Sequence, residues 1–160
     1  MVLVVLLYIM EILKKNNMLH RHFIISSSSN GVHNIPNNEV HFIPHDYTNV
    51  NIIIDTIIGS PTFNIPILWI DFSDILERYI ISCGDIITKI NADSFNGLDI
   101  TSIFLPNSIT EIDTYALNCY YLESIIYDGT IEEWNLIKKY DFWCDNSKPV
   151  IYCTDGTIEL

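Results

Sequence analysis

Two stretches decide the fold, because Ile87-Thr88-Lys89-Ile90 and Ile109-Thr110-Glu111-Ile112 open two copies of one 22-residue unit. The copies align without a gap, and all five apolar positions of the unit are apolar in both. Besides the quoted isoleucines, these positions hold Phe95 and Leu117, Ile100 and Leu122, and Ile103 and Ile125. A unit of this length cannot bury its apolar face alone, so its copies must stack. The repeat therefore predicts a short solenoid.

Each unit is expected to contain one strand, along which side chains alternate between the core and the outside. The inward positions are Ile103, Leu105, Ile125 and Tyr127. The outward positions form a candidate binding face, which consists of Ser102, Phe104, Ser124 and Ile126. Phe104 and Ile126 are apolar where exposure predicts polar residues. They mark either a surface for a partner or a patch that another segment of this chain covers, such as residues 3–9.

The flanking segments are expected to cap the repeats, because terminal units lack a neighbour. Residues 50–58 and 66–70 are rich in β-branched residues and predict two strands, within an N-terminal cap of residues 50–78. Residues 79–84 predict the strand of an earlier unit, 22 residues before Ile103. After the repeats (79–130), the C-terminal cap (131–160) is expected to hold a helix over residues 132–139, with Trp134 and Ile137 facing the core, and a strand over 150–153.

These residues carry a family resemblance. The stretch ITSIFLPNSITEI at residues 100–112 is similar to the leucine-rich repeat of the BspA-like (treponemal-type) surface antigens, whose unit runs LxxIxLPxSVxxIxxxAFxxC. Ala116-Leu117 stands where the family has Ala-Phe, and Cys119 matches its cysteine, whereas the earlier copy departs with Ser94-Phe95 and Gly97. Residues 125–134 and 152–156 resemble its C-terminal unit. The resemblance implies a mainly β leucine-rich-repeat solenoid with short helical turns, and a surface-displayed binding module.

Residues 1–49 are predicted to be a separate N-terminal part, in which an apolar segment precedes a polar linker that need not be well ordered. The apolar run at residues 1–13 is too short to span a bilayer and lacks the features of a good signal peptide, so membrane association through it is weakly indicated. His33-Asn34-Ile35-Pro36 and His41-Phe42-Ile43-Pro44 are each expected to be extended, because each ends in proline.

The composition disfavours nucleic acid as a ligand. The formal net charge is −12, from 8 Lys and Arg against 20 Asp and Glu, and such a chain repels phosphate backbones. The four cysteines show no CxxC spacing, and Cys119 is predicted to be a packed thiol. Cys144 and Cys153 flank a possible hairpin, so pairing in an oxidising compartment stays open as an alternative.

No enzyme motif is present: the chain has no GxSxG, GxxxxGK, GxGxxG or HExxH. Asp128-Gly129-Thr130 and Asp155-Gly156-Thr157 suit either a turn or, less well, calcium. The scattered histidines supply no complete metal site, so we expect no catalytic residues, no cofactor and no metal.

The function that these features predict is a non-catalytic scaffold for protein or glycan binding, of the surface or adhesion type. The alternative is a structural component of a larger assembly, of a viral or phage-like kind, with the N-terminus as its attachment segment. The resemblance favours an extracellular location. The identity of the partner and the oligomeric state stay open.

Overall fold

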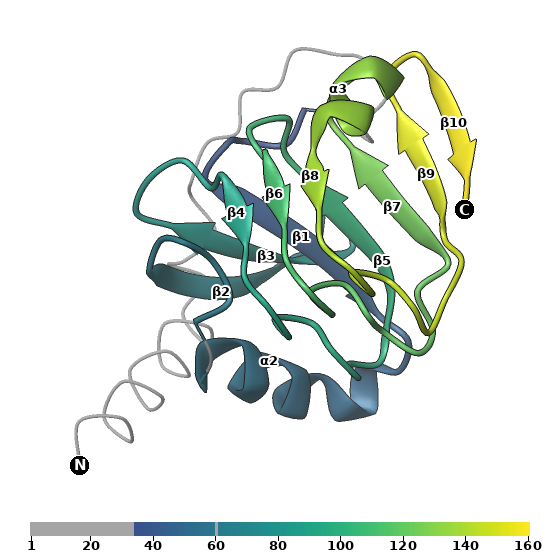
Figure 1. Ribbon diagram of the computed structural model, residues 1–160. Helices are drawn as coiled ribbons and strands as arrows, with labels where there is room; N and C mark the ends of the chain where they lie inside the picture. The colour runs from purple at the N-terminus through teal and green to yellow at the C-terminus, as the bar shows by residue number, and fades with distance from the viewer. Residues whose placement is uncertain (1–33, 60) are drawn as a thin grey trace.

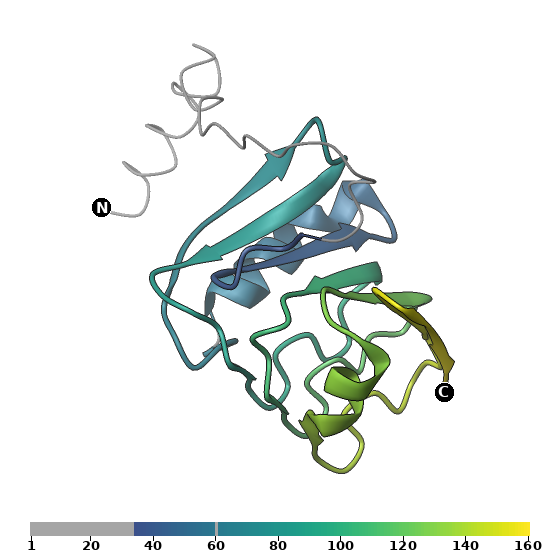
Figure 2. The same cartoon turned by 90° about the horizontal axis from the view of Figure 1, so that it is seen from above.

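The protein is mainly β and is built on two sheets (Figures 1 and 2). The computed structural model describes residues 34–59 and 61–160. One sheet has seven strands in the order β10-β9-β7-β5-β1-β3-β2, and the other has three in the order β4-β6-β8. The large sheet contains β1 (Glu39–Pro44), β2 (Ile67–Ser73), β3 (Arg78–Cys83), β5 (Ile100–Leu105), β7 (Ser124–Tyr127), β9 (Val150–Cys153) and β10 (Gly156–Glu159). The small sheet contains β4 (Lys89–Ile90), β6 (Glu111–Ile112) and β8 (Lys138–Lys139).

The repeat units stack in the register that the 22-residue period predicts. Strands β5 and β7 are parallel, and Ile103 lies beside Ile125. Strands β4 and β6 are also parallel, and Lys89 lies beside Glu111. Since each sheet receives one strand from every unit, the chain passes repeatedly from one sheet to the other, and Figure 1 shows the short strands in front of the large sheet.

The core lies between the two sheets, as expected from the apolar positions of the unit. Ile103, Ile125 and Ile151 on neighbouring strands of the large sheet are each 0% exposed. Phe95 follows strand β4 and Leu117 follows strand β6, and both side chains are buried as well. The predicted inward positions of the unit are therefore confirmed.

The prediction of a strand over residues 50–58 was wrong, because Val50–Gly59 forms helix α2. It follows the short 3-10 helix η1 (Tyr47–Asn49), which Asp46 caps by accepting a hydrogen bond from the Thr48 amide. Ile53 and Ile57 of α2 are buried, and their spacing of four residues places both on one helical face. Burial of this face against the core outweighs the β preference of the isoleucines.

The earlier strand, β3, does not stack on β5 as the repeat predicts. Strand β1 lies between them and is antiparallel to both, with Phe42 beside Tyr79 on one side and Ile103 on the other. Residues 39–44 are thus a central strand and not part of a linker, and the extended conformation expected for residues 41–44 is confirmed. Val40 and Phe42 of β1 are both 0% exposed. The position of β1 between β3 and β5 therefore buries two apolar side chains, which would have no core to pack against if β3 paired directly with β5.

The C-terminal cap contains helix α3 (Ile131–Leu136), which is shorter than predicted. Thr130 and Glu133 form a capping box at its start. The two lysines expected in its last turn instead form β8, which pairs with β6. Trp134 and Ile137 are buried as predicted, and the predicted strand over residues 150–153 is β9, which β10 extends as a hairpin.

Candidate functional site

The four residues of the predicted binding face lie together on the outer face of the large sheet, the side away from the small sheet. Ser102 is the register partner of Ser124, and Phe104 is that of Ile126. The hydroxyl oxygens of Ser102 and Ser124 are 2.8 Å apart and share a hydrogen bond. Ser102 and Ser124 are half-buried.

Of the two alternatives for the apolar residues of this face, the structure supports cover by another segment of the chain. Phe104 is 7% exposed and Ile126 is 6% exposed, and both cluster with the buried Ile35. The backbone N–H groups of Asn34 and Ile35 donate to the two carboxylate oxygens of Asp128, at 2.8 and 3.0 Å. Residues 34–35, which are far from β5 and β7 in the sequence, therefore cover this patch. Residues 3–9, which were the expected cover, lie outside the described residues.

A buried cation lies beside the same patch. The Arg78 guanidinium carbon is 3.9 Å from the centre of the Phe104 ring, and Arg78 is 5% exposed. His41, on β1, is 2% exposed and bonds to the Glu39 carboxylate through Nε2 at 2.8 Å. Burial lowers the pKa of Arg78 to about 10, although Glu39 opposes this shift. Within the described chain, Arg78 Nε and His41 Nδ1 are buried without a hydrogen-bond partner.

We expect His41 to make the protein less stable in mild acid. Burial is the main cause that lowers the pKa of His41 below its usual 6.5; the neighbouring Arg78 also lowers it, while Glu39 opposes the shift. The unfolded chain therefore takes up a proton near pH 6.5 while the folded chain does not, so stability falls as the pH drops below about 6.5. The measurement is the urea midpoint as a function of pH.

The His41→Gln variant should lose this part of the pH dependence, because glutamine does not titrate. His45→Gln is the matched control, since His45 is exposed, and it should keep the profile of the unchanged protein. If His41→Gln also keeps that profile, His41 does not cause the acid sensitivity.

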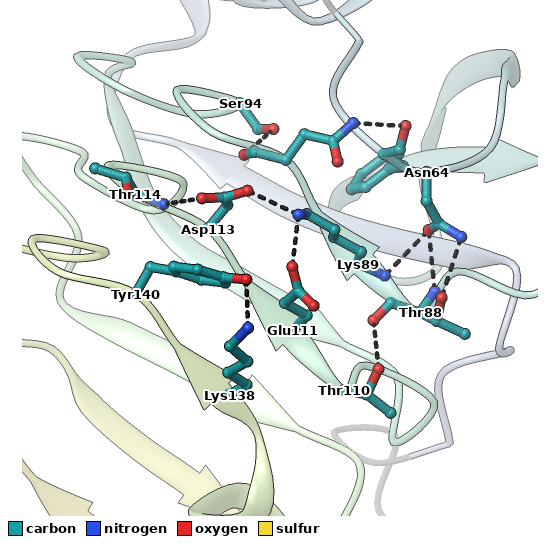
Figure 3. Close-up of polar contacts among 12 residues, drawn as sticks. Asn64, Thr88, Lys89, Ser94, Thr110, Glu111, Asp113, Thr114, Lys138 and Tyr140 are labelled. Atoms are coloured by element: carbon teal, nitrogen blue, oxygen red, sulfur yellow. Dashed lines mark hydrogen bonds and ion pairs between the residues drawn. The ribbon is translucent and has the colours of Figure 1, made fainter.

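The exposed side of the small sheet carries a second constellation, which the sequence did not single out (Figure 3). Lys89 forms ion pairs with Glu111 at 2.5 Å and with Asp113 at 2.8 Å. These bonds raise the pKa of Lys89 and lower the pKa of both carboxyl groups. Lys138 donates to the Tyr140 hydroxyl at 2.5 Å. Lys89 and Glu111 have opposite charges at equivalent positions of the repeat, and this feature of the sequence could have predicted their ion pair.

This network joins neighbouring units, but it supplies no reactive group. Asn64, which precedes the repeats, extends it by accepting from the backbone N–H groups of Thr88 and Lys89 at 3.2 and 3.0 Å. Every carboxylate that it contains is bonded to a lysine, and such exposed pairs contribute little to stability. The network therefore connects Asn64 and two neighbouring units along the small sheet.

The cysteines are all free, including Cys144 and Cys153. Cys119 is fully buried, and its thiol donates to the Phe95 carbonyl oxygen at 3.1 Å, which confirms the predicted packed thiol. Burial raises the pKa of Cys119 and raises that of Cys83 to about 11. Both thiols are therefore protonated at neutral pH, the form that is a poor nucleophile.

The first Asp-Gly-Thr stretch forms a bend before α3, and the second lies at the turn between β9 and β10. In both, the Asp carboxylate accepts hydrogen bonds from backbone N–H groups. Asp128 accepts from Asn34 and Ile35, and Asp155 accepts from the Ile131 amide at 2.8 Å. Among residues 34–59 and 61–160, no group of three or more His, Cys, Asp or Glu side chains is placed to hold a metal ion. In the same residues, no helix has both the length and the apolar character needed to span a bilayer.

Parallel strands with a 22-residue offset and a shared core define the class of repeat proteins. The model of the BspA type leucine rich repeat region matches residues 71–157, more than half of the chain, so the protein belongs to the BspA-type leucine-rich repeat family. No curated protein and no solved structure matches the chain. Repeats of this family are typical of protein-interaction scaffolds.

Proposed function

We propose that the protein is a non-catalytic scaffold that binds a protein or glycan partner, as a surface or adhesion-type module. Its stacked units then form a short leucine-rich-repeat solenoid, and the outer face of the large sheet contacts the partner. Ser102 and Ser124 belong to this contact, while Phe104 and Ile126 support it from beneath Ile35.

One observation carries this proposal: the outer rows of side chains continue in register across three repeat strands. The row of Phe104 and Ile126 continues to Tyr152 on β9, and the row of Ser102 and Ser124 continues to Val150. Tyr152 is 42% exposed, so an aromatic side chain stands free beside the covered patch. Tyrosine is enriched in interfaces, because it offers apolar area together with a hydroxyl group.

The proposal is tested by presenting the whole protein to arrays of extracellular proteins and of glycans. The affinity is then measured for each protein or glycan whose binding saturates. Tyr152→Ser and Ser124→Arg should weaken a partner that uses this face by about tenfold or more, the effect of losing a central contact. Thr110→Arg is the control, since Thr110 is exposed beside the small sheet.

Two outcomes contradict the proposal. One is the lack of any saturable binder together with an assembly of fixed stoichiometry in light scattering, which supports the alternative role as a structural component. The other is a binder whose affinity Thr110→Arg reduces as much as Tyr152→Ser does.

A further inference from the structure

The repeat units are joined on one side by three turns, residues 91–98, 113–121 and 140–147, which we call the turn edge. Their backbones bond to one another: the Asp93 amide donates to Thr114 at 3.1 Å, and the Leu117 amide donates to Trp143 at 2.9 Å. The Asn118 side chain bonds Asn96 on one side, and on the other its carbonyl oxygen accepts from the Asp145 and Asn146 amides. The turn edge is therefore a fixed surface in which each turn lies beside the next.

Two aromatic rings are stacked on this edge without a role in the core. Asp93, Tyr115 and Phe142 occupy equivalent positions, with φ of 58°, 55° and 58°. The rings of Tyr115 and Phe142 have centroids 5.6 Å apart and planes inclined by 13°. Phe142 is 55% exposed, so burial does not explain a phenylalanine at a backbone conformation that favours Gly, Asn or Asp.

The middle turn ends in two more exposed aromatic side chains. Tyr120 is 62% exposed and Tyr121 is 46% exposed. Tyr121 stacks on the His45 ring, with centroids 4.0 Å apart, and the Tyr120 ring lies beside Gly97 of the preceding turn. With Phe142 on the third turn, two neighbouring turns therefore present exposed aromatic groups.

The charge of this edge is negative. The three turns and the residues that link them to β5, β7 and β9 contain Asp93, Asp99, Glu123, Asp141 and Asp145 in addition to Asp113, and the one base among them is Lys148. Asp113 is paired with Lys89, but none of the other five carboxylates forms an ion pair with a described residue. Asp93, which accepts a hydrogen bond from Asn96 at 2.8 Å, and Asp141 are exposed on the turn edge that carries these rings. Exposed rings and carboxylates without a basic partner on one surface suit a cation, which gains from both the ring quadrupole and the negative charge.

We propose that the turn edge binds an arginine-rich segment of a partner protein, with a guanidinium group on the Tyr115–Phe142 stack and Asp93 and Asp141 as its counter-charges. Arginine fits better than lysine, because its planar group stacks on a ring and also bonds carboxylates in a fork. This surface is separate from the outer face of the large sheet, so either proposal can fail alone.

The test uses the whole protein and a labelled peptide of alternating arginine and serine, with the citrulline version as its neutral match. Fluorescence anisotropy should show saturable binding of the arginine peptide, weaker binding of the citrulline peptide, and a loss of affinity with added salt. Phe142→Ser should lower the affinity for the arginine peptide by about two- to thirty-fold, the range of one cation–ring contact.

A pair of charge-matched variants separates a site from general attraction to an acidic protein. Asp93→Asn with Asp141→Asn should weaken binding, whereas Glu132→Gln with Glu159→Gln removes the same charge at exposed positions elsewhere and should change it less than about twofold. Equal effects of the two double variants would overturn the proposal, as would equal affinity for the two peptides. Unchanged binding by a folded Phe142→Ser variant would also overturn it.

Discussion

Removal of the chain from Glu132 onward is expected to make the protein aggregate. The deletion takes away α3, β8, β9 and β10, and with them Trp134, which is 2% exposed. The Trp134 ring meets Tyr127 edge-on, with centroids 5.3 Å apart, and Trp143 at 6.0 Å. The truncated protein would expose the apolar end of the repeats and the free edges of β6 and β7, and such surfaces associate.

The measurement is size-exclusion chromatography with light scattering, followed by urea unfolding of any soluble fraction. A point variant gives the same test without a deletion: Trp134→Ala should cost about 3–5 kcal/mol of unfolding free energy, through lost burial and a cavity. Leu136→Ala is its control in the same helix, because Leu136 is 78% exposed, and it should change stability by less than about 0.5 kcal/mol. A truncated protein that stays monomeric and unfolds cooperatively would show that residues 132–160 do not cap the repeats.

Replacement of Phe104 and Ile126 together by serine is expected to be strongly destabilising. Both side chains are buried beneath Ile35, and the Arg78 guanidinium rests on the Phe104 ring. Truncation of a buried Phe costs about 3–5 kcal/mol and of a buried Ile about 2–5 kcal/mol, and two neighbouring changes need not add. The loss should approach or exceed that of Ile103→Ala on the opposite face of β5, which is expected to cost about 2–5 kcal/mol.

Urea unfolding of the double variant checks this prediction. Tyr152→Ser is the matched control, since it removes an exposed ring from the same outer row, and we expect its unfolding free energy to change by less than about 0.5 kcal/mol. A double variant as stable as the unchanged protein would mean that the patch stands open to solvent. That result would support the first of the two alternatives that the sequence left open, a direct contact surface.

The sequence by itself determined the features that depend on the repeat. The 22-residue offset between Ile103 and Ile125, and between Lys89 and Glu111, predicts which residues are neighbours on adjacent strands. It also predicts the buried positions of the unit, including Ile103 and Ile125, and the motif within the unit indicates the family of the chain. These inferences hold because each unit buries its apolar face against a copy of itself, so the pattern along the chain is also the pattern of contacts.

The tertiary structure decided what lies where the repeat ends. Residues 50–59 form a helix, β1 separates β3 from β5, and Ile35 covers Phe104 and Ile126. The sequence therefore predicted how the residues of the candidate face pair across β5 and β7, and it left open whether Phe104 and Ile126 are exposed or covered. These contacts join segments far apart in the chain, so no local sequence period predicts them. They form because Ile57, Phe42 and Ile35 bury apolar surface against the core.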